Sequence, residues 1–348
     1  MYSSTKTADQ PELADSASAL DGPPKLVLST FFDVNEQSSA LSGGSDLHYA
    51  QLTCGQFSGS CRELRMRHFQ VVRETNNIPV NMYGTLWPQS IVFGMPLRML
   101  GNGSINGLTL GPRISSIVRG DRGHEVIMPP ADIVYLAVDA RVLEDYISVV
   151  EEVSLAGWLT QGPIVLPESA AIIGLTAHLL DLLDYSFGCA LTTLAAQVQR
   201  DILQEVLARV TPIVLGHLES PGPSKTFVGR HQLVQRAREF VLDRVGARDP
   251  VQMIDVCRAL AVSRRTLQYS FEEVLGLNPA TYLRVLRLNR ARQDLLANGV
   301  NALQVKDVAS RWGFWHLSRF GAEYRELYGE LPSVTLKNPR AQRARSST

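Results

Sequence analysis

The sequence predicts an α+β protein with a β-rich N-terminal part, two long helices and an all-α C-terminal part. Between residues 26 and 165, short apolar runs such as SIVFGMPL and DIVYLAV alternate with turn segments such as GNGSING and RGDRGH, which is typical of antiparallel strands. Beyond residue 165, apolar residues recur at three-to-four spacing, which is typical of amphipathic helices. Residues 225–348 carry 21 Lys and Arg against 11 Asp and Glu, although the whole chain has no net charge. This asymmetry indicates an electrostatic role for the C-terminal part.

Residues 1–25 are acidic and rich in small side chains, so we expect a disordered tail and no secretion signal. The strands that follow favour an antiparallel sandwich or barrel of the cupin-like kind, with one helix, ARVLEDYISVVEEV, near its end. The four cysteines form no CxxC or CxxH pair, which argues against a zinc site or disulfides and fits a reducing cytoplasm. We expect no membrane span, because no run of 18 apolar residues occurs.

Two apolar helices are expected over residues 168–187 and 190–216, and they complete a domain over residues 26–215. Their apolar faces leave two alternatives open, because they can pair with a second subunit in a homodimer or pack on their own sheet. Residues 216–229, rich in Gly, Pro and Ser, are expected to form a linker. A helical domain over residues 230–335 and a disordered basic tail over 336–348 then follow.

The C-terminal domain contains an internal near-repeat. In each copy a small residue lies four positions before a turn residue: Cys257 before Ala261, and Ala309 before Gly313. Small residues at this position let two helices cross closely at a tight turn. Each copy continues with a helix of about a dozen residues that ends at a glycine, with a proline three residues later. The pattern predicts two helix-turn-helix units.

In the first unit, VQMIDVCRALA is the expected supporting helix, and Ser263 is the expected N-cap of RRTLQYSFEEVL. The predicted apolar face consists of Leu267, Phe271 and Leu275. The residues that point elsewhere are Arg264, Arg265, Gln268 and Tyr269. Arginine and glutamine pair bidentately with guanine and adenine, so these four are candidate DNA contacts. The alternative, an ordinary amphipathic surface helix, is disfavoured by the turn pattern and the charge asymmetry.

In the second unit, VKDVASRW is the expected supporting helix and HLSRFGAEYRELY the second helix. Its predicted apolar face consists of Leu317, Phe320, Tyr324 and Leu327. The candidate DNA contacts are His316, Ser318 and Arg319, with a packing role as the alternative for His316. Trp312 and Trp315 flank the turn, and we expect both in the core.

A long helix over residues 281–296 is expected to join the two units. Its predicted packing positions are Leu283, Leu286, Leu288, Ala291 and Leu295, and its basic positions are Arg284, Arg287, Arg290 and Arg292. A helix of this length holds two recognition helices about 34 Å apart, which is one turn of DNA. Arg287 is a candidate phosphate contact.

The phrases SRRTLQYSF, GLNPATYLRVLRLNRARQDLL and VKDVASRWGFWHLSRFGAEYRELYGELPS resemble the AraC/XylS family of bacterial regulators, over about residues 230–335. Shorter phrases, among them RLN, WGFWHL and PSVTL, and more weakly QLTCGQFSG and WPQSIVFGMP, resemble the ethanolamine-operon regulator subgroup. The resemblance implies a dimerising sensor domain joined to a double helix-turn-helix that contacts promoter DNA and RNA polymerase. It also implies ethanolamine as the effector, with cobalamin as a cofactor.

The positions at which the family reads bases can be carried over onto this sequence. In the first unit they fall on Arg265, Gln268 and Tyr269, and in the second near Leu317, Ser318, Arg319, Gly321 and Ala322. Many members have arginine in place of Ala322 and a small residue in place of Trp315. These departures indicate that the second unit mainly holds phosphate or touches polymerase.

Within the β-rich part, candidate residues for an effector pocket are Arg73, Glu74, Tyr83 and Trp87, although Trp87 also fits a plain core position. A cupin-like metalloenzyme is the competing interpretation, and it needs clustered ligands. His48, His68 and His124 are isolated, and no GxSxG, P-loop or GxGxxG motif occurs, so we expect no enzyme. Two recognition helices beside a large sensor domain also argue against a non-specific architectural DNA binder. The sequence therefore predicts an effector-responsive transcription regulator that acts as an activator. The pathway is ethanolamine use or, as the alternative, an unrelated one.

Overall fold

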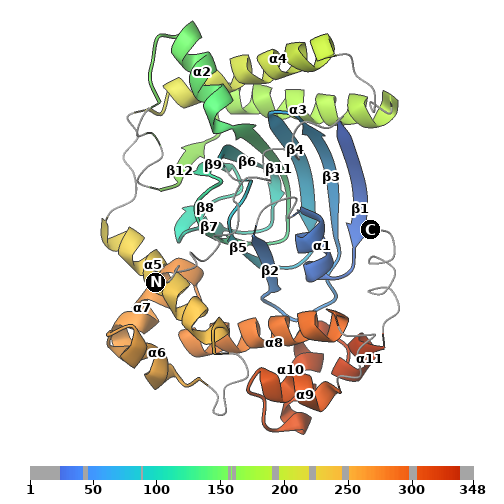
Figure 1. Ribbon diagram of the computed structural model, residues 1–348, viewed down its shortest axis with the longest axis vertical. Coiled ribbons are helices and arrows are strands. Elements are labelled where there is room, and N and C mark those ends of the chain that lie inside the picture. The colour runs from blue at the N-terminus through green and yellow to red at the C-terminus, as the bar shows by residue number, and fades with distance from the viewer. Residues whose placement is uncertain are drawn as a thin grey trace, which may run out of the picture.

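The computed structural model describes residues 24–41, 46–87, 89–155, 158, 162–189, 196–218, 225–244, 251–297 and 304–337. Figure 1 shows two facing β-sheets, with helices α3 and α4 across one end of them and a group of helices at the opposite end. The predicted α+β class is confirmed. The expected tails, residues 1–25 and 336–348, lie outside the described residues except at their inner ends, where Lys25 begins a strand and Leu336 ends a helix.

The larger sheet in the described residues has seven antiparallel strands. In spatial order they are β1 (Lys25–Phe31), β3 (Gly59–Met66), β4 (Phe69–Asn76), β11 (Ala131–Asp139), β6 (Ser90–Met99), β9 (Ile114–Arg119) and β12 (Ile164–Pro167). Successive residues of a strand point to opposite faces, so Val71 packs in the outer core while Val72 packs between the sheets.

The smaller sheet has five antiparallel strands among the described residues. In spatial order they are β2 (Leu47–Gln51), β5 (Val80–Gly84), β10 (His124–Met128), β7 (Gly103–Ile105) and β8 (Leu108–Leu110). A second apolar cluster, to which Val72, Met82 and Val126 belong, fills the space between the two sheets. Helix α1 (Val34–Leu41) packs against β2 and was not expected, because VNEQSSAL carries too few apolar residues to show helical periodicity.

Three further helices cover the larger sheet: α2 (Ala140–Val150), α3 (Ala170–Cys189) and α4 (Ala196–Leu215). Leu175, Leu179 and Leu183 of α3 are buried in one cluster with residues of the larger sheet, so this face of the helix packs on its own sheet. The stretch Ala170–Gly188 is long and apolar enough to cross a membrane, which is also true of many helices that cover a core. The outer face of α3 exposes Ile173 and Tyr185.

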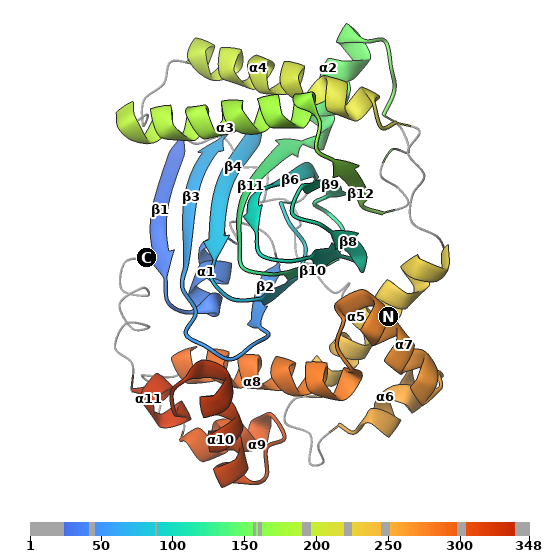
Figure 2. The same ribbon diagram turned by 180° about the vertical axis from the view of Figure 1, so that it is seen from behind.

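The described residues of the C-terminal domain, 225–244, 251–297 and 304–337, form helices joined by turns. The helices are α5 (Lys225–Leu242), α6 (Met253–Ala259), α7 (Arg264–Leu275), α8 (Pro279–Ala297), α9 (Val305–Arg311), α10 (Leu317–Tyr328) and α11 (Pro332–Leu336). Helix α5 begins inside the segment expected to be a linker, of which residues 219–224 are outside the described part. The first half of α8 belongs to the core of the first unit and its second half to the core of the second unit. Figure 2 shows α8 running beneath the β-sheets as the link between these units.

The two units repeat the same turn. Ala261 and Gly313 both adopt left-handed backbone conformations, with φ of 53° and 75°. In the first unit the Val262 amide donates to the Cys257 carbonyl at 3.0 Å. In the second unit the Phe314 amide donates to the Ala309 carbonyl at 2.8 Å. This shared hydrogen bond closes the turn and explains the repeated spacing.

The predicted helix caps are confirmed. The Ser263 hydroxyl accepts a hydrogen bond from the Thr266 amide at 3.0 Å, at the start of α7. Gly276 and Gly329 end α7 and α10 with φ of 67° and 73°, a conformation that glycine adopts without steric cost. The sequence therefore defines both ends of α7 and the C-terminal end of α10.

Candidate functional site

Helix α7 presents one exposed polar face to solvent. Leu267 and Phe271 on its other face are fully buried, which fixes how the helix is turned. The exposed face carries the four residues predicted for the first unit, Arg264, Arg265, Gln268 and Tyr269. The guanidinium of Arg265 lies 5.3 Å from the ring centre of Tyr269 and donates to its hydroxyl at 3.1 Å. The face thus offers donors of the type that reads base edges in a major groove.

The exposed face of α10 differs in composition. Ser318 and Arg319 are exposed, and His316 occupies the N-cap position without a side-chain capping bond. A shallow hollow on this face is lined by Leu317, Ser318, Gly321, Ala322, Arg325, Glu326 and Leu331. The hollow includes positions at which the resemblance implies base contacts, namely Leu317, Ser318, Gly321 and Ala322. None of these four residues has a long polar side chain.

Two aromatic and apolar predictions for the second unit were wrong. Trp315, expected in the core, is 54% exposed, and Leu317, expected on the apolar face of the second helix, is 49% exposed. Leu317 is the first residue of α10 and lies beyond the reach of the core formed by Phe320 and Tyr324. The expectation for Trp312 is confirmed, because it is 9% exposed and its indole N–H donates to Asp294 at 2.9 Å.

Several basic side chains of α8 and α10 are already paired within the chain. Arg319 and Arg284 both donate to the carboxylate of Glu323, each at 2.7 Å, so this carboxylate joins α10 to α8. Arg287 donates to the Leu283 carbonyl at 3.2 Å, and burial lowers its pKa. Of the eight predicted DNA contacts, Arg287 is the one that is not exposed.

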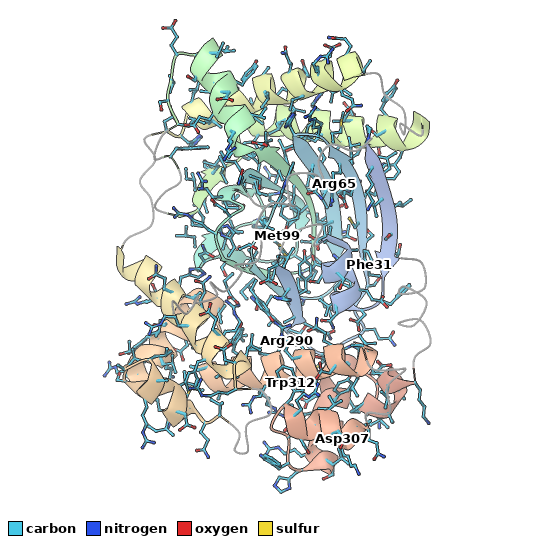
Figure 3. All side chains as sticks on the ribbon, in the orientation of Figure 1. Phe31, Arg65, Met99, Arg290, Asp307 and Trp312 are labelled. Atoms are coloured by element: carbon cyan, nitrogen blue, oxygen red, sulfur yellow. The ribbon has the colours of Figure 1, made fainter. Side chains whose placement is uncertain are left out.

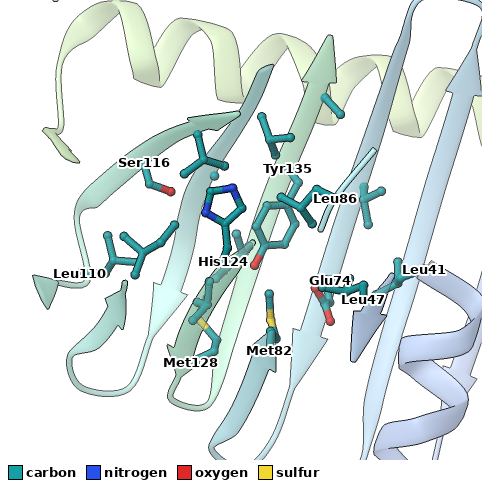
Figure 4. Close-up of a pocket in the computed structure, with 18 of the residues that line it drawn as sticks. Leu41, Leu47, Glu74, Met82, Leu86, Leu110, Ser116, His124, Met128 and Tyr135 are labelled. Atoms are coloured by element: carbon teal, nitrogen blue, oxygen red, sulfur yellow. The ribbon is translucent and has the colours of Figure 1, made fainter. Parts of the chain in front are cut away.

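A cavity of about 120 Å³ lies between the two sheets (Figure 4). Its walls are mostly apolar, and two of the four predicted effector contacts, Glu74 and Trp87, line it. Tyr83 also borders it, but the Tyr83 ring packs against Arg238 in the interface with the C-terminal domain. Arg73 is not among the residues that line the cavity. Arg73 and Glu74 are neighbours on a strand and point to opposite faces, and Arg73 pairs with Asp132 at 2.7 Å.

Glu74 is the acidic residue of the cavity wall. It is 6% exposed, accepts a hydrogen bond from the Gln37 side-chain amide at 2.5 Å, and is also bonded by the Tyr49 hydroxyl. Burial raises its pKa to about 7, and these two hydrogen bonds only partly offset that effect. Glu74 therefore changes its charge near neutral pH.

His124 also lines the cavity, although the sequence did not indicate it as an effector contact. Its Nε2 lies 2.6 Å from the Arg119 carbonyl, so Nε2 carries the proton. Its Nδ1 is buried and has no hydrogen-bond partner within the described residues. Burial lowers the pKa of the ring, so the neutral form presents a buried acceptor at Nδ1.

A buried ion pair joins the β-sheets to the C-terminal domain. Glu125 of β10, fully buried, pairs with Arg238 of α5. The same carboxylate accepts from the Asn81 amide at 2.7 Å and from the Tyr282 hydroxyl at 3.3 Å. The Arg238 guanidinium lies 4.2 Å from the ring centre of Tyr83, so this contact links β5, β10, α5 and α8.

A second buried ion pair lies at the other end of α8. Asp33, directly before α1, accepts from Arg292 at 2.5 Å. Arg292 also donates to Glu330 at 2.8 Å and to the Tyr324 hydroxyl at 3.2 Å. Figure 3 places Arg290 at the boundary between the sheets and α8, and Arg290 lies 5.9 Å from the ring centre of Tyr83. Arg290 and Arg292 therefore face the β-sheets, although the sequence suggested only a basic helix surface.

A signal for these interface arginines was present in the sequence. Arg238 lies at core spacing between Val234 and Val241, and Arg292 lies at core spacing between Leu288 and Leu295. A charged residue at a core position of a helix needs a buried counter-charge. Among the described residues, no group of three or more His, Cys, Asp or Glu is placed to hold a metal ion.

Comparisons with known proteins bear on the C-terminal domain. A family model described as a helix-turn-helix domain matches residues 256–338. The probable thc operon regulatory protein of Rhodococcus erythropolis is 38% identical over 91 residues, which is 26% of this chain and 27% of that protein. The chain thus spans about a quarter of the length of that relative.

A solved structure and a shorter relative extend the comparison. The AraC-like transcriptional activator CuxR is 14% identical, with a TM-score of 0.42, over 77% of this chain and 95% of that one. The XylDLEGF operon transcriptional activator 2 of Pseudomonas putida is 32% identical over 123 residues, which is 35% of this chain and 77% of that protein. Because this relative is matched over most of its length, the chain belongs to the AraC/XylS family of DNA-binding transcription regulators.

Proposed function

We propose that the chain is a sequence-specific, effector-responsive regulator of transcription, in which α7 reads bases in one major groove and α10 occupies the next. The observation that carries this proposal is the exposed face of α7, where Arg265 and Gln268 stand together on a helix with defined ends. Helix α8, at 19 residues, is about 28 Å long and separates the two units by roughly one turn of DNA.

The effector response is supported by a chain of contacts from the cavity to the C-terminal domain. Glu74 in the cavity wall accepts from Gln37 on α1, and Asp33 directly before α1 holds Arg292 on α8. A ligand that hydrogen-bonds to Glu74 alters the bond between Glu74 and Gln37, and so shifts α1. A shift of α1 in turn alters the ion pair between Asp33 and Arg292 of α8. Such a ligand shifts the equilibrium between two arrangements by its difference in affinity for them.

The smaller sheet supplies a second connection. In β5, Met82 faces the cavity, while Asn81 lies in the interface with the C-terminal domain. In β10, His124 faces the cavity while Glu125 holds Arg238. Successive residues of each strand therefore point to the cavity on one side and to the C-terminal domain on the other. A ligand that displaces β5 or β10 also disturbs the interface with that domain.

The narrower expectations belong to this proposal. From the family resemblance we propose that the chain activates transcription and contacts RNA polymerase. We also propose that it forms a homodimer through the exposed face of α3. The proposal of ethanolamine as effector, with cobalamin, rests on short resembling phrases alone. The relatives described above are named as regulators of a thc operon and of a XylDLEGF operon. A largely apolar cavity of about 120 Å³ suits neither a small polar amino alcohol nor a corrinoid many times larger, which favours an AraC-type regulator of an unrelated pathway.

The base-reading role of α7 is tested with Gln268→Ala. On the DNA site that the chain prefers, we expect affinity to fall by about 1–3 kcal/mol, or roughly 5- to 150-fold, with relaxed preference at one base pair. Fluorescence titration with sites that vary at single positions measures both effects. Gln197→Ala, on an exposed position of α4, is the matched control and should bind like the wild type. Unchanged base preference in Gln268→Ala would show that α7 does not read that base.

A further inference from the structure

We infer that the cavity between the sheets binds an apolar small molecule that carries a hydrogen-bond donor, an amine or a hydroxyl, and that Glu74 receives this donor. The inference rests on the proposed function, because it names the class of effector. Its first basis is size. An engineered cavity of about 150 Å³ binds benzene, so a cavity of 120 Å³ holds an apolar body of about one six-membered ring.

The second basis is the kind of polar group that the wall presents. Leu47, Val92 and Met128 are typical of its apolar surface. Hydroxyl and amide groups of the wall, on Tyr49, Gln70, Ser116 and Tyr135, can both donate and accept. Ionised Glu74 and neutral His124 add groups that can only accept at the cavity: the carboxylate oxygens of Glu74 and the Nδ1 of His124, which has no partner within the described residues. Figure 4 shows both side chains directed into the cavity, with Tyr135 between them. A buried acceptor without a partner is costly, and a ligand that donates to it removes that cost.

The third basis is charge. No Lys or Arg is among the described residues that line the cavity. A ligand carboxylate would therefore enter an apolar space beside Glu74 without a counter-charge, which both desolvation and like-charge repulsion oppose. An ammonium group finds its counter-charge in ionised Glu74, and a hydroxyl finds an acceptor in either charge state.

The experiment uses four probes that share one ring: benzylamine, benzyl alcohol, toluene and benzoate. Binding to the full-length chain is measured at pH 8 by the shift of the thermal unfolding midpoint and by competition titration. We expect at least one of the two donors to bind tenfold or more tightly than toluene, and benzoate to bind more weakly than both donors. Saturating donor should raise the midpoint by about 2–4 °C or more.

A comparison of benzylamine with benzyl alcohol shows whether the donor is an ammonium group or a hydroxyl. In Glu74→Gln, we expect benzylamine to lose at least tenfold in affinity, while benzyl alcohol changes little because the amide oxygen still accepts. The matched control Glu144→Gln, on an exposed position of α2, should leave every affinity unchanged.

Three results would overturn the inference: toluene as tight as both donors, benzoate tighter than both, or benzylamine unaffected by Glu74→Gln. If none of the probes binds, the ligand class is wrong, while the DNA preference of Gln268→Ala still judges the proposed function separately.

Discussion

Replacement of Glu125 by Leu is expected to lower the free energy of unfolding by about 3–5 kcal/mol. Arg238 is 5% exposed, and the substitution leaves its guanidinium buried without a counter-charge. Asn81 and Tyr282 lose an acceptor at the same time. Urea denaturation of the full chain, followed by circular dichroism, measures this change.

A double variant separates the ion pair from general damage to the interface. Because apolar pairs of similar volume replace buried ion pairs well, Glu125→Leu combined with Arg238→Met should recover most of the lost stability. The exposed pair between Glu205 and Arg209 is the control, and Glu205→Leu should cost no more than about 1 kcal/mol. Equal effects of Glu125→Leu and Glu205→Leu would contradict a buried interdomain pair.

The stability of the chain is expected to depend on pH through Glu74. Its pKa is about 7 in the folded chain and 4.5 as its ordinary value, so between these pH values the folded state binds more protons than the unfolded state. Stability due to this group is therefore fully present below about pH 4.5 and falls as pH rises to about 7. The shift corresponds to about 3 kcal/mol lost over this window.

The Glu74→Gln variant isolates this effect from other titrating groups, including His124, whose lowered pKa acts in the opposite direction. The free energy of unfolding is measured by urea denaturation at pH 5 and at pH 8 for both proteins. We expect the difference, Glu74→Gln minus wild type, to be about 3 kcal/mol larger at pH 8 than at pH 5. Glu144→Gln should show no such gain. A constant difference between Glu74→Gln and the wild type across this range would show that Glu74 keeps an ordinary pKa.

The local features of the C-terminal domain could be predicted because each depends on a few neighbouring residues. The cap at Ser263, the glycine ends of α7 and α10, and the turns at Ala261 and Gly313 all follow from backbone geometry. The exposed face of α7 follows in the same way from the spacing of Leu267 and Phe271. These features were therefore accessible without any knowledge of the tertiary fold.

The interface and the cavity could not be predicted because they join residues far apart in the chain. Glu125 and Arg238 are 113 positions apart, and Asp33 and Arg292 are 259 positions apart. His124 is isolated in the sequence, and only the packing of the two facing sheets brings it to the same cavity as Glu74. Arg73 was misplaced because the choice between the two faces of a strand depends on the packing of the whole sheet.

The most direct test of DNA reading by α7 and α10 is the selection of binding sites from random DNA by the full-length chain at physiological salt. We expect an enriched sequence with two blocks centred about 10 base pairs apart. The block read by α7 should be the stronger, because α10 offers Gly321 and Ala322 where long polar side chains would be needed. Recovery of no preferred sequence, with equal affinity for all sites, would contradict this conclusion and indicate a binder of the DNA backbone alone.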